Sequence, residues 1–181
     1  MATNFTLFDT PIGACALVWG DRGPVGVALP EPSAAATRAG VQRRFAGSVE
    51  REPPPALRPV IERIVALLRG GSDDLADIAL DMRGVPDFNQ RVYASARAIK
   101  PGSTLTYGEV AARLGEGPQA ARAVGQALGA NPFPIIVPCH RVLAAGGQAG
   151  GFSAPGGTRT KLALLEIEGA PLGGSPGLFD A

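Results

Sequence analysis

The chain has 181 residues, of which 45% are hydrophobic and 18% charged, which is enough apolar material for one large or two small domains and argues against a disordered protein. The formal net charge of +1 excludes a protein that is held to a polyanion by its overall charge alone. The two cysteines form no disulfide framework and no apolar run approaches the ~20 residues that cross a bilayer, so we expect a cytoplasmic protein without a membrane anchor.

The first elements along the chain are β-strands. Residues 5–29 carry three β-rich runs, FTLFDT, ACALVW and VGVAL, and turn residues at 11–13 and 21–24 separate them. These runs predict a small sheet. A last strand over residues 78–82 is expected to return to this sheet.

Two helices are predicted between these strands. The first covers residues 34–46, and the second covers residues 56–69, where apolar residues recur at helical spacing until a Gly-Gly pair ends the run. The prolines at 53–55 form a stiff connector between the two helices. The Gly-Val-Pro at 84–86 marks a domain boundary.

After this boundary the pattern becomes helical. Apolar residues of 87–102, DFNQRVYASARAIKPG, fall on one stripe of a helix that the final Pro-Gly ends. Two short helices, over residues 106–114 and 119–128, flank a turn at 115–117, and this spacing is that of a helix-turn-helix. Alone, the pattern is equally typical of a helical hairpin buried for packing.

The second of these short helices, QAARAVGQALG, has few bulky side chains. Its backbone could therefore approach another helix or the floor of a DNA groove, although the high helix propensity of alanine explains the composition as well. Residues 88–169 hold eight basic and four acidic residues, a net charge of +4. The rest of the chain holds nine basic and twelve acidic residues, a net charge of −3. The second half is therefore the better candidate to bind a polyanion, unless the difference only reflects ordinary variation in solvated faces.

The most informative stretch is residues 131–142, NPFPIIVPCHRV. Three prolines around an apolar strand predict that Cys139 is presented at a rigid, non-helical position. Cys139 abuts the chain's only histidine, His140, and Arg141, and both neighbours favour the thiolate that performs nucleophilic chemistry. Because adjacent side chains of an extended segment point to opposite sides, contact with His140 needs a turn or a bridging water. Cys15, inside an alternating run, is typical of an inert buried residue.

A histidine in such a pair needs a carboxylate to orient its ring. Glu166 and Glu168, at the end of the KLALLEIEG helix, are the candidates, and the composition does not choose between them.

The run PCHRV, preceded by NPFPIIV and by TYGEVAARLG…AARAVGQALGANP, resembles the active-site and helix-turn-helix region of the O6-alkylguanine-DNA alkyltransferases. The resemblance covers about residues 86–170, and the N-terminal half matches the family only in outline, through TPIG and the strand pattern. It implies an α/β (α+β) fold, with a small mixed sheet and helices in a ribonuclease H-like support domain at 1–85. A mainly helical DNA-binding and alkyl-transfer domain at 86–170 and a flexible tail at 171–181 would follow.

The resemblance also implies a function. The protein would repair DNA by direct reversal, moving a methyl or other alkyl group from O6 of guanine to its own Cys139, once and irreversibly. O4 of thymine is a second candidate position from which the alkyl group would be removed. The expected partner is double-stranded DNA that carries O6-alkylguanine, bound through its minor groove by a monomer, with no cofactor and no membrane.

Carried over residue by residue, the resemblance makes Cys139 the alkyl acceptor and His140 its base through a water. Glu168 would orient the histidine, and Asn131 would support the active-site turn. Tyr107 would stand beside the rotated phosphate and protonate the departing guanine. A base that reacts must also leave the duplex stack, which costs a few kcal/mol.

Arg122 would fill the gap that the extruded guanine leaves in the stack. The residues expected to contact DNA are Thr106, Tyr107, Ala121, Arg122 and Gly125. The residues expected to wall the substrate pocket are Leu128, Pro134, Val142, Phe152 and Ser153.

The chain departs from the family's pattern in two places. Where the family has a tyrosine or a close relative, a small residue and Gly-Gly, this chain reads GFSAPGG at 151–157, with Ala154-Pro155 inserted. Because the corresponding loop of the family walls the alkyl pocket, the resemblance implies that the extra proline narrows or stiffens this wall, and the range of accepted alkyl sizes stays open. Some relatives bind zinc in the N-terminal domain through cysteines and histidines, but this chain offers only Cys15 there, so no metal is predicted.

Three other functions fit parts of the sequence. A cysteine hydrolase with Cys139 and His140 predicts turnover and an oxyanion hole, but hydrolase dyads usually join distant segments. A non-catalytic protein that binds alkylated DNA is the second alternative, and relatives of that kind lack the cysteine. A thiol redox sensor would leave the helix-turn-helix and Arg122 unexplained.

Overall fold

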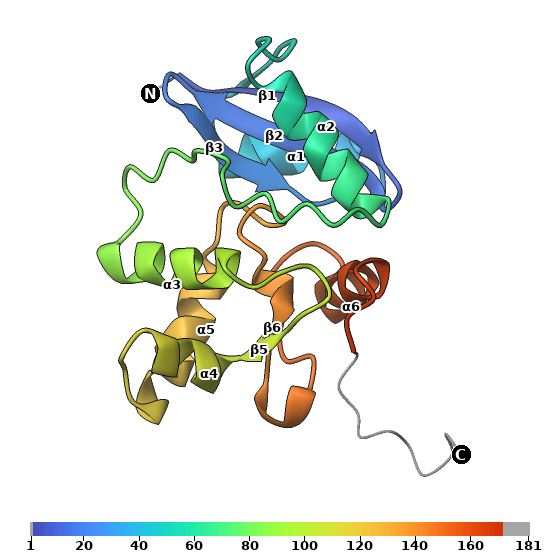
Figure 1. Cartoon of the computed structure of the whole chain (residues 1–181). Coiled ribbons are helices and arrows are strands. Elements are labelled where there is room, and N and C mark those ends of the chain that lie inside the picture. Colours follow the sequence, from blue (N-terminus) through green and yellow to red (C-terminus); the bar gives the residue numbers. More distant parts are fainter. Residues whose placement is uncertain (1, 172–181) are drawn as a thin grey trace, which may run out of the picture.

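The computed structural model describes residues 2–171, which form a sheet part (residues 2–86) and a helical part (residues 87–171) lying against each other (Figure 1). The sheet part contains β1 (Asn4–Thr10), β2 (Gly13–Gly20), β3 (Gly23–Ala28), α1 (Ala34–Arg44), β4 (Val49–Glu50) and α2 (Arg58–Leu68). The helical part contains α3 (Asp87–Arg97), β5 (Leu105–Thr106), α4 (Tyr107–Arg113), α5 (Ala121–Gly129), β6 (Val142–Leu143) and α6 (Gly157–Ile167). This mixed α+β architecture confirms the predicted fold class. Beyond Pro171, the tail expected at 171–181 lies outside the described residues.

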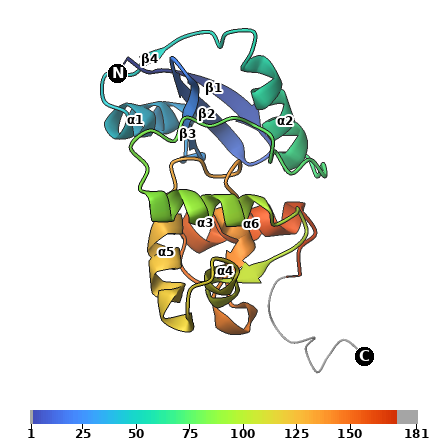
Figure 2. The same ribbon diagram turned by 60° about the vertical axis from the view of Figure 1, so that its left-hand side comes forward.

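The sheet has the strand order β3-β2-β1-β4, with antiparallel pairs around β2 and a parallel pair of β1 with β4. Helices α1 and α2 cover opposite faces of this sheet (Figure 2). Alternate residues of β2 therefore point into different packing clusters: Leu17 and Trp19 lie in the main core with Ile64 of α2, and Val18 packs with Val41 of α1. Because both faces are covered, β2 reads as one continuous apolar run.

The prediction of a strand at residues 78–82 is wrong, because the structure has no strand there. This segment is irregular, although the Asp81 N–H donates to the carbonyl oxygen of Pro24 in β3, at 2.9 Å. Turns at both ends of the segment use backbone groups that a strand would pair with its neighbour, because Ile78 N–H donates to Leu75 and Val85 N–H donates to Met82.

The predicted helix-turn-helix is present as α4 and α5. A capping box begins α4: the Thr106 hydroxyl accepts from the Glu109 N–H at 3.1 Å, and the Glu109 carboxylate accepts from the Thr106 N–H at 2.6 Å. The second helix starts as a single 3-10 turn, Pro118–Ala120, before α5. The buried Tyr93 hydroxyl of α3 donates to the carbonyl oxygen of Ala127 at 2.8 Å and ties α3 to α5.

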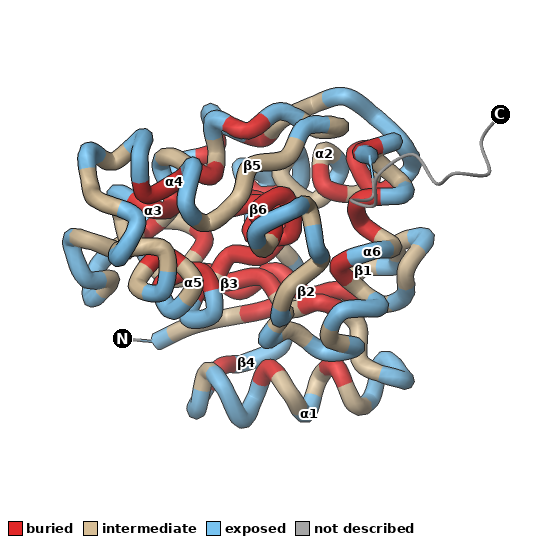
Figure 3. The backbone as a smooth tube through the Cα atoms, turned by 90° about the horizontal axis from the view of Figure 1, so that it is seen from below, coloured by how far each residue is buried: buried red, intermediate tan, exposed pale blue. Residues whose placement is uncertain are grey.

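The main hydrophobic core contains residues of both parts, from Cys15 on β2 to Val142 on β6, so the two parts share one core. Figure 3 shows the buried stretches gathered in the middle of the molecule, with exposed turns around them. Among residues 2–171, no helix combines the length and the apolar character that a bilayer crossing requires.

Candidate active site

The turn before the cysteine, residues 131–138, is bridged from within by the side chain of Asn131. Asn131 donates from Nδ2 to the carbonyl oxygen of Val137 at 2.9 Å and accepts at Oδ1 from the Phe133 N–H at 2.8 Å. Inside this turn Ile135 adopts φ +75°, a left-handed conformation that costs a β-branched residue on the order of 1–3 kcal/mol. The side chain of Ile135 is 1% exposed, so the surrounding packing holds the strained backbone in place.

The cysteine itself begins a single 3-10 turn, Cys139–Arg141, which corrects the expected non-helical presentation. Cys139 is 8% exposed, and burial raises the pKa of its thiol. A hydrogen bond with the Asn131 side chain and the positive charge of Lys161 act in the opposite direction. The side chains of His140 and Arg141, which were expected to favour the thiolate, are instead directed to Glu168.

Glu168, at the C-terminal cap of α6, joins the two residues that follow the cysteine. Its carboxylate lies 2.9 Å from Nε2 of His140 and accepts from Arg141 at 3.0 Å and 2.7 Å. Burial alone would raise the pKa of Glu168, but the hydrogen bonds from His140 and Arg141 outweigh it and hold this pKa at about 2. Glu166, the other candidate from the sequence, is exposed. The geometry therefore selects Glu168 as the partner of the histidine.

The histidine is buried and keeps one nitrogen unused. Burial lowers the pKa of His140 despite the neighbouring carboxylate of Glu168, so the ring is neutral near pH 7. Its Nδ1 atom is buried and has no hydrogen-bond partner among residues 2–171. With Nε2 beside Glu168, Nδ1 is the nitrogen that remains to accept a proton.

Sequence reasoning missed Lys161 of α6. Its side chain is 0% exposed, and its Nζ donates to the carbonyl oxygen of Val142 at 2.6 Å. The same Nζ lies 5.7 Å from the ring centroid of Tyr107 and 5.9 Å from that of Phe152. Burial lowers the pKa of Lys161 to about 8, and Cys139 acts against this shift. The available signal was its spacing, because Lys161 shares the buried stripe of α6 with Leu164.

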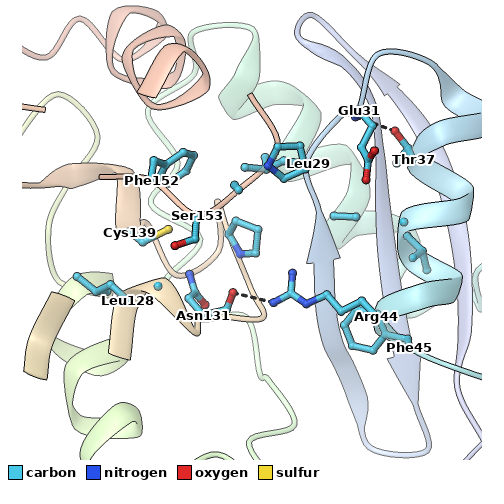
Figure 4. A pocket seen from close by; sticks show the side chains of 17 residues that line it. Leu29, Glu31, Thr37, Arg44, Phe45, Leu128, Asn131, Cys139, Phe152 and Ser153 are labelled. Carbon is cyan, nitrogen blue, oxygen red and sulfur yellow. Dashed lines mark hydrogen bonds between the residues drawn. The ribbon is translucent and has the colours of Figure 1, made fainter. Parts of the chain in front are cut away.

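Two cavities meet at the cysteine. The larger has a volume of about 400 Å³ and the smaller about 210 Å³, and Cys139, Leu128, Gly129, Phe152 and Ser153 line both. Figure 4 shows the Cys139 sulfur and the Ser153 hydroxyl close together at one side of the larger cavity, opposite Thr37 and Phe45.

Four of the five predicted pocket residues line these cavities, since Pro134 lines the larger one in addition to Leu128, Phe152 and Ser153. Val142 does not, which corrects that prediction: it is fully buried in β6, where it pairs with Leu105. The inserted Ala154 and Pro155 both line the larger cavity.

The residues expected to contact DNA lie around the smaller cavity or along α5. Tyr107 and Gly125 line the cavity, and burial raises the pKa of the Tyr107 hydroxyl, which therefore stays protonated. A Cβ atom at Gly125 would meet the Tyr107 ring only at 3.8 Å, so packing within the protein does not require this glycine. Arg122 is exposed in the first turn of α5 and makes no hydrogen bond or ion pair with another of residues 2–171, and the preceding Ala121 is half-buried. Thr106 caps α4.

No group of three or more His, Cys, Asp or Glu side chains within the described part of the chain is arranged to hold a metal ion.

Comparison with known proteins gives one consistent result. The family model described as "6-O-methylguanine DNA methyltransferase, DNA binding domain" matches residues 87–170. The methylated-DNA–protein-cysteine methyltransferase of Methanothermobacter thermautotrophicus is 38% identical over 164 residues, which are 91% of this chain and 84% of the relative. A DNA base-flipping protein of Thermus thermophilus is 37% identical over 161 residues, 89% of this chain and 97% of the relative. The crystal structure of Mycobacterium tuberculosis OGT in complex with DNA superposes with a TM-score of 0.73 at 35% identity, covering 93% of this chain and 95% of that one.

Proposed function

The chain belongs to the family of the methylated-DNA–protein-cysteine methyltransferases, and on this premise we propose that Cys139 is its alkyl acceptor. The protein is a direct-reversal DNA repair protein, which moves a methyl or other alkyl group from O6 of guanine to its own cysteine. Because the thioether that forms is not cleaved afterwards, each molecule acts once. The observation that carries the assignment is the position of Cys139 at the junction of two cavities, next to the buried pair of His140 and Glu168. Cys15 lines neither cavity, and burial raises its pKa to about 11.

The smaller cavity is the site for the extruded guanine. It lies between the first residue of α4, Tyr107, and Gly125 of α5, so a base that leaves the stack beside α5 reaches Cys139 through it. Arg122 on the exposed side of α5 fills the gap in the stack and offsets part of the few kcal/mol that unstacking costs. The small side chains of α5 suit the minor groove, where little bulk fits.

The chemistry needs a thiolate, because the O6 substituent of guanine is a poor electrophile. The Cys139 thiol gives its proton through a water to Nδ1 of His140, and Glu168 at Nε2 stabilises the imidazolium. The sulfur then bonds to the substituent carbon attached to O6, and the C–O bond breaks with its electrons moving to the purine. Guanine takes a proton from the Tyr107 hydroxyl, and the proton held by His140 later restores the phenol.

Lys161 is a positioning residue for these steps. Its ammonium group lies over the Tyr107 ring and favours the ionised thiol, so it stabilises negative charge on both groups during transfer. The backbone acceptor Val142 fixes the amine in this position.

The sheet part supports the active-site turn. The Val27 N–H of β3 donates to the carbonyl oxygen of Pro132 at 2.8 Å, and Arg44 of α1 donates to that of Asn131 at 3.0 Å. Residues 1–85 therefore act as a support domain, and residues 86–170 bind DNA and transfer the alkyl group. The protein works as a monomer in the cytoplasm, where a free thiol at position 139 stays reduced.

The test is intact-protein mass spectrometry after incubation with a duplex that carries O6-methylguanine. We expect one methyl group on each wild-type molecule, none on Cys139→Ser, and full labelling of the control Cys15→Ser. Repeated turnover would favour a hydrolase, and a failure of the wild type to gain any mass would favour a non-catalytic DNA-binding protein. Labelling of Cys139→Ser at the wild-type rate would contradict the assignment of the acceptor. A duplex with O4-methylthymine tests the second base in the same assay.

A further inference from the structure

Helix α5 connects the proposed DNA contact to the active-site turn. Arg122 is exposed in its first turn, and Leu128 and Gly129 at its other end line both cavities beside the cysteine. Only Ala130 separates the helix from Asn131, whose side chain bridges the turn before the cysteine. The way in which α5 ends therefore sets the position of Asn131.

The end of this helix leaves one carbonyl group without its backbone partner. In a continuing helix the Ala127 oxygen would accept from the Asn131 N–H, four positions further on. That N–H donates instead to the oxygen of Leu128 at 3.2 Å, and the Ala130 N–H donates to that of Gln126 at 3.1 Å. Ala127 is buried, so its oxygen needs a hydrogen-bond donor from elsewhere in the protein.

The Tyr93 hydroxyl of α3 is that donor. It donates to the Ala127 oxygen at 2.8 Å, and Tyr93 is itself buried. Burial raises the pKa of Tyr93, so the hydroxyl keeps the proton that this bond requires. The bond thus fixes the last turn of α5 against α3, a helix that lines neither of the two cavities.

We propose that Tyr93 is a positioning residue, which holds the end of α5 so that Asn131 keeps its bonds to the turn and to the Cys139 thiol. The bond from the Asn131 side chain lowers the pKa of Cys139, against the effect of burial. Without the Tyr93 hydroxyl, the Asn131 N–H would move to the buried oxygen of Ala127, which extends the helix by one position and turns the Asn131 side chain away from the thiol. The inference rests on the proposed function, because the turn acts through Cys139.

The experiment measures the thiol directly. The wild type, Tyr93→Phe and Ile64→Val are each prepared with Cys15→Ser, so that one cysteine remains. The rate at which iodoacetamide alkylates Cys139 is then followed from about pH 6 to about pH 10. We expect the midpoint of the profile to rise by roughly 0.7 pH unit in Tyr93→Phe, because the loss of one hydrogen bond changes an equilibrium about fivefold. Transfer from a duplex with O6-methylguanine near pH 7 should slow about fivefold as well.

Ile64→Val is the matched control. It removes one carbon from the buried side of α2, at a cost in stability of the same order as the loss of one hydrogen bond, and urea unfolding verifies the match. A merely structural role of Tyr93 predicts the same pH profile for both variants, whereas we expect Ile64→Val to keep that of the wild type. Asn131→Ala should itself raise the midpoint, and adding Tyr93→Phe should raise it no further, because Tyr93 acts through Asn131.

The outcomes separate this inference from the function on which it rests. An unchanged profile in Tyr93→Phe, or a shift of equal size in Ile64→Val, overturns the positioning role. A further shift in the double variant overturns the route through Asn131, and if Asn131→Ala does not fold, the comparison of the first two variants decides alone. Absence of methyl transfer by the wild type overturns the proposed function, while the iodoacetamide profiles still decide the role of Tyr93.

Discussion

Nε2 of His140 and Oε1 of Glu168 lie 2.9 Å apart, although 28 positions separate the two residues in the chain. The side chains are 1% and 3% exposed, and the same carboxylate neutralises the fully buried Arg141. One carboxylate thus serves both the ring next to the cysteine and a buried cation, which ties the chemistry to the stability of the fold.

Glu168→Gln should therefore reduce both stability and activity. Removing the carboxylate leaves the charge of Arg141 buried without a partner, so we expect a loss of about 3–5 kcal/mol in the free energy of unfolding. Alkyl transfer should slow because the amide no longer stabilises an imidazolium. Urea unfolding and single-turnover transfer measure the two effects. Glu166→Gln, at an exposed position of the same helix, is the control and should stay within about 0.5 kcal/mol of the wild type.

Lys161→Met should slow transfer without destabilising the protein. The substitution removes a buried positive charge that favours the Cys139 thiolate, so the rise of the transfer rate with pH should shift to higher pH. A merely structural role would leave this pH profile in place. Arg159→Met, at an exposed position of α6, is the matched control.

The same variant makes a prediction for stability against pH. The pKa of Lys161 is about 8 in the folded protein and 10.5 in its ordinary state, so the unfolded chain binds more protons between these values. The lysine therefore costs stability below pH 8, and the cost disappears as the pH rises toward 10.5. The stability advantage of Lys161→Met over the wild type should shrink across this window, and a constant difference would contradict the depressed pKa.

Arg122→Ala should impair repair of duplex DNA much more than reaction with a free base. Only the duplex requires a base to leave the stack, and filling the gap offsets part of a cost of a few kcal/mol, so we expect at least a tenfold slower reaction on duplex. The reaction with free O6-methylguanine should change less than about twofold, well within what a surface substitution does to a distant site. Arg113→Ala, at the exposed end of α4, controls for the loss of a positive charge. Equal slowing of both reactions would show that Arg122 acts inside the pocket.

Alkylation of Cys139 should destabilise the protein. Methylation turns the thiol into a thioether, a weaker hydrogen-bond partner for the Asn131 side chain, which holds the turn that keeps Ile135 in a left-handed conformation, so we expect a loss of about 0.5–1.5 kcal/mol. At about 2–4 °C per kcal/mol, the melting temperature should fall measurably after reaction. Calorimetry before and after incubation with one equivalent of substrate measures the shift, and equal melting temperatures would count against it.

The local pattern of the sequence was enough to predict what depends on neighbouring residues. The helix-turn-helix followed from apolar spacing and turn residues, and PCHRV pointed to the cysteine because the motif is contiguous. The prediction of a strand at 78–82 failed because the side-chain pattern does not show that turns at both ends of this segment use backbone groups that a strand would need for pairing.

Long-range contacts explain the other gaps. Arg44 donates a hydrogen bond to the backbone of Asn131, 87 positions further along the chain, and nothing in the local sequence of α1 predicts this contact. Lys161 had a signal, a charge at a core position of α6, but charged residues are rarely buried, so this position alone does not predict a buried lysine. The choice of Glu168 over Glu166 came from family resemblance, and only the folded geometry gives its physical reason.

The hydrogen bond from Val27 to Pro132 has a wider consequence, because β3 is an outer strand of the sheet. An unpaired outer strand is a template onto which extended chains add, and here the loop that carries the nucleophile occupies part of it. A molecule that has spent its cysteine and shifted that loop would uncover this template. The alkylated protein would then differ from the unreacted one at its surface, because it would expose part of an edge strand that can pair with another extended chain.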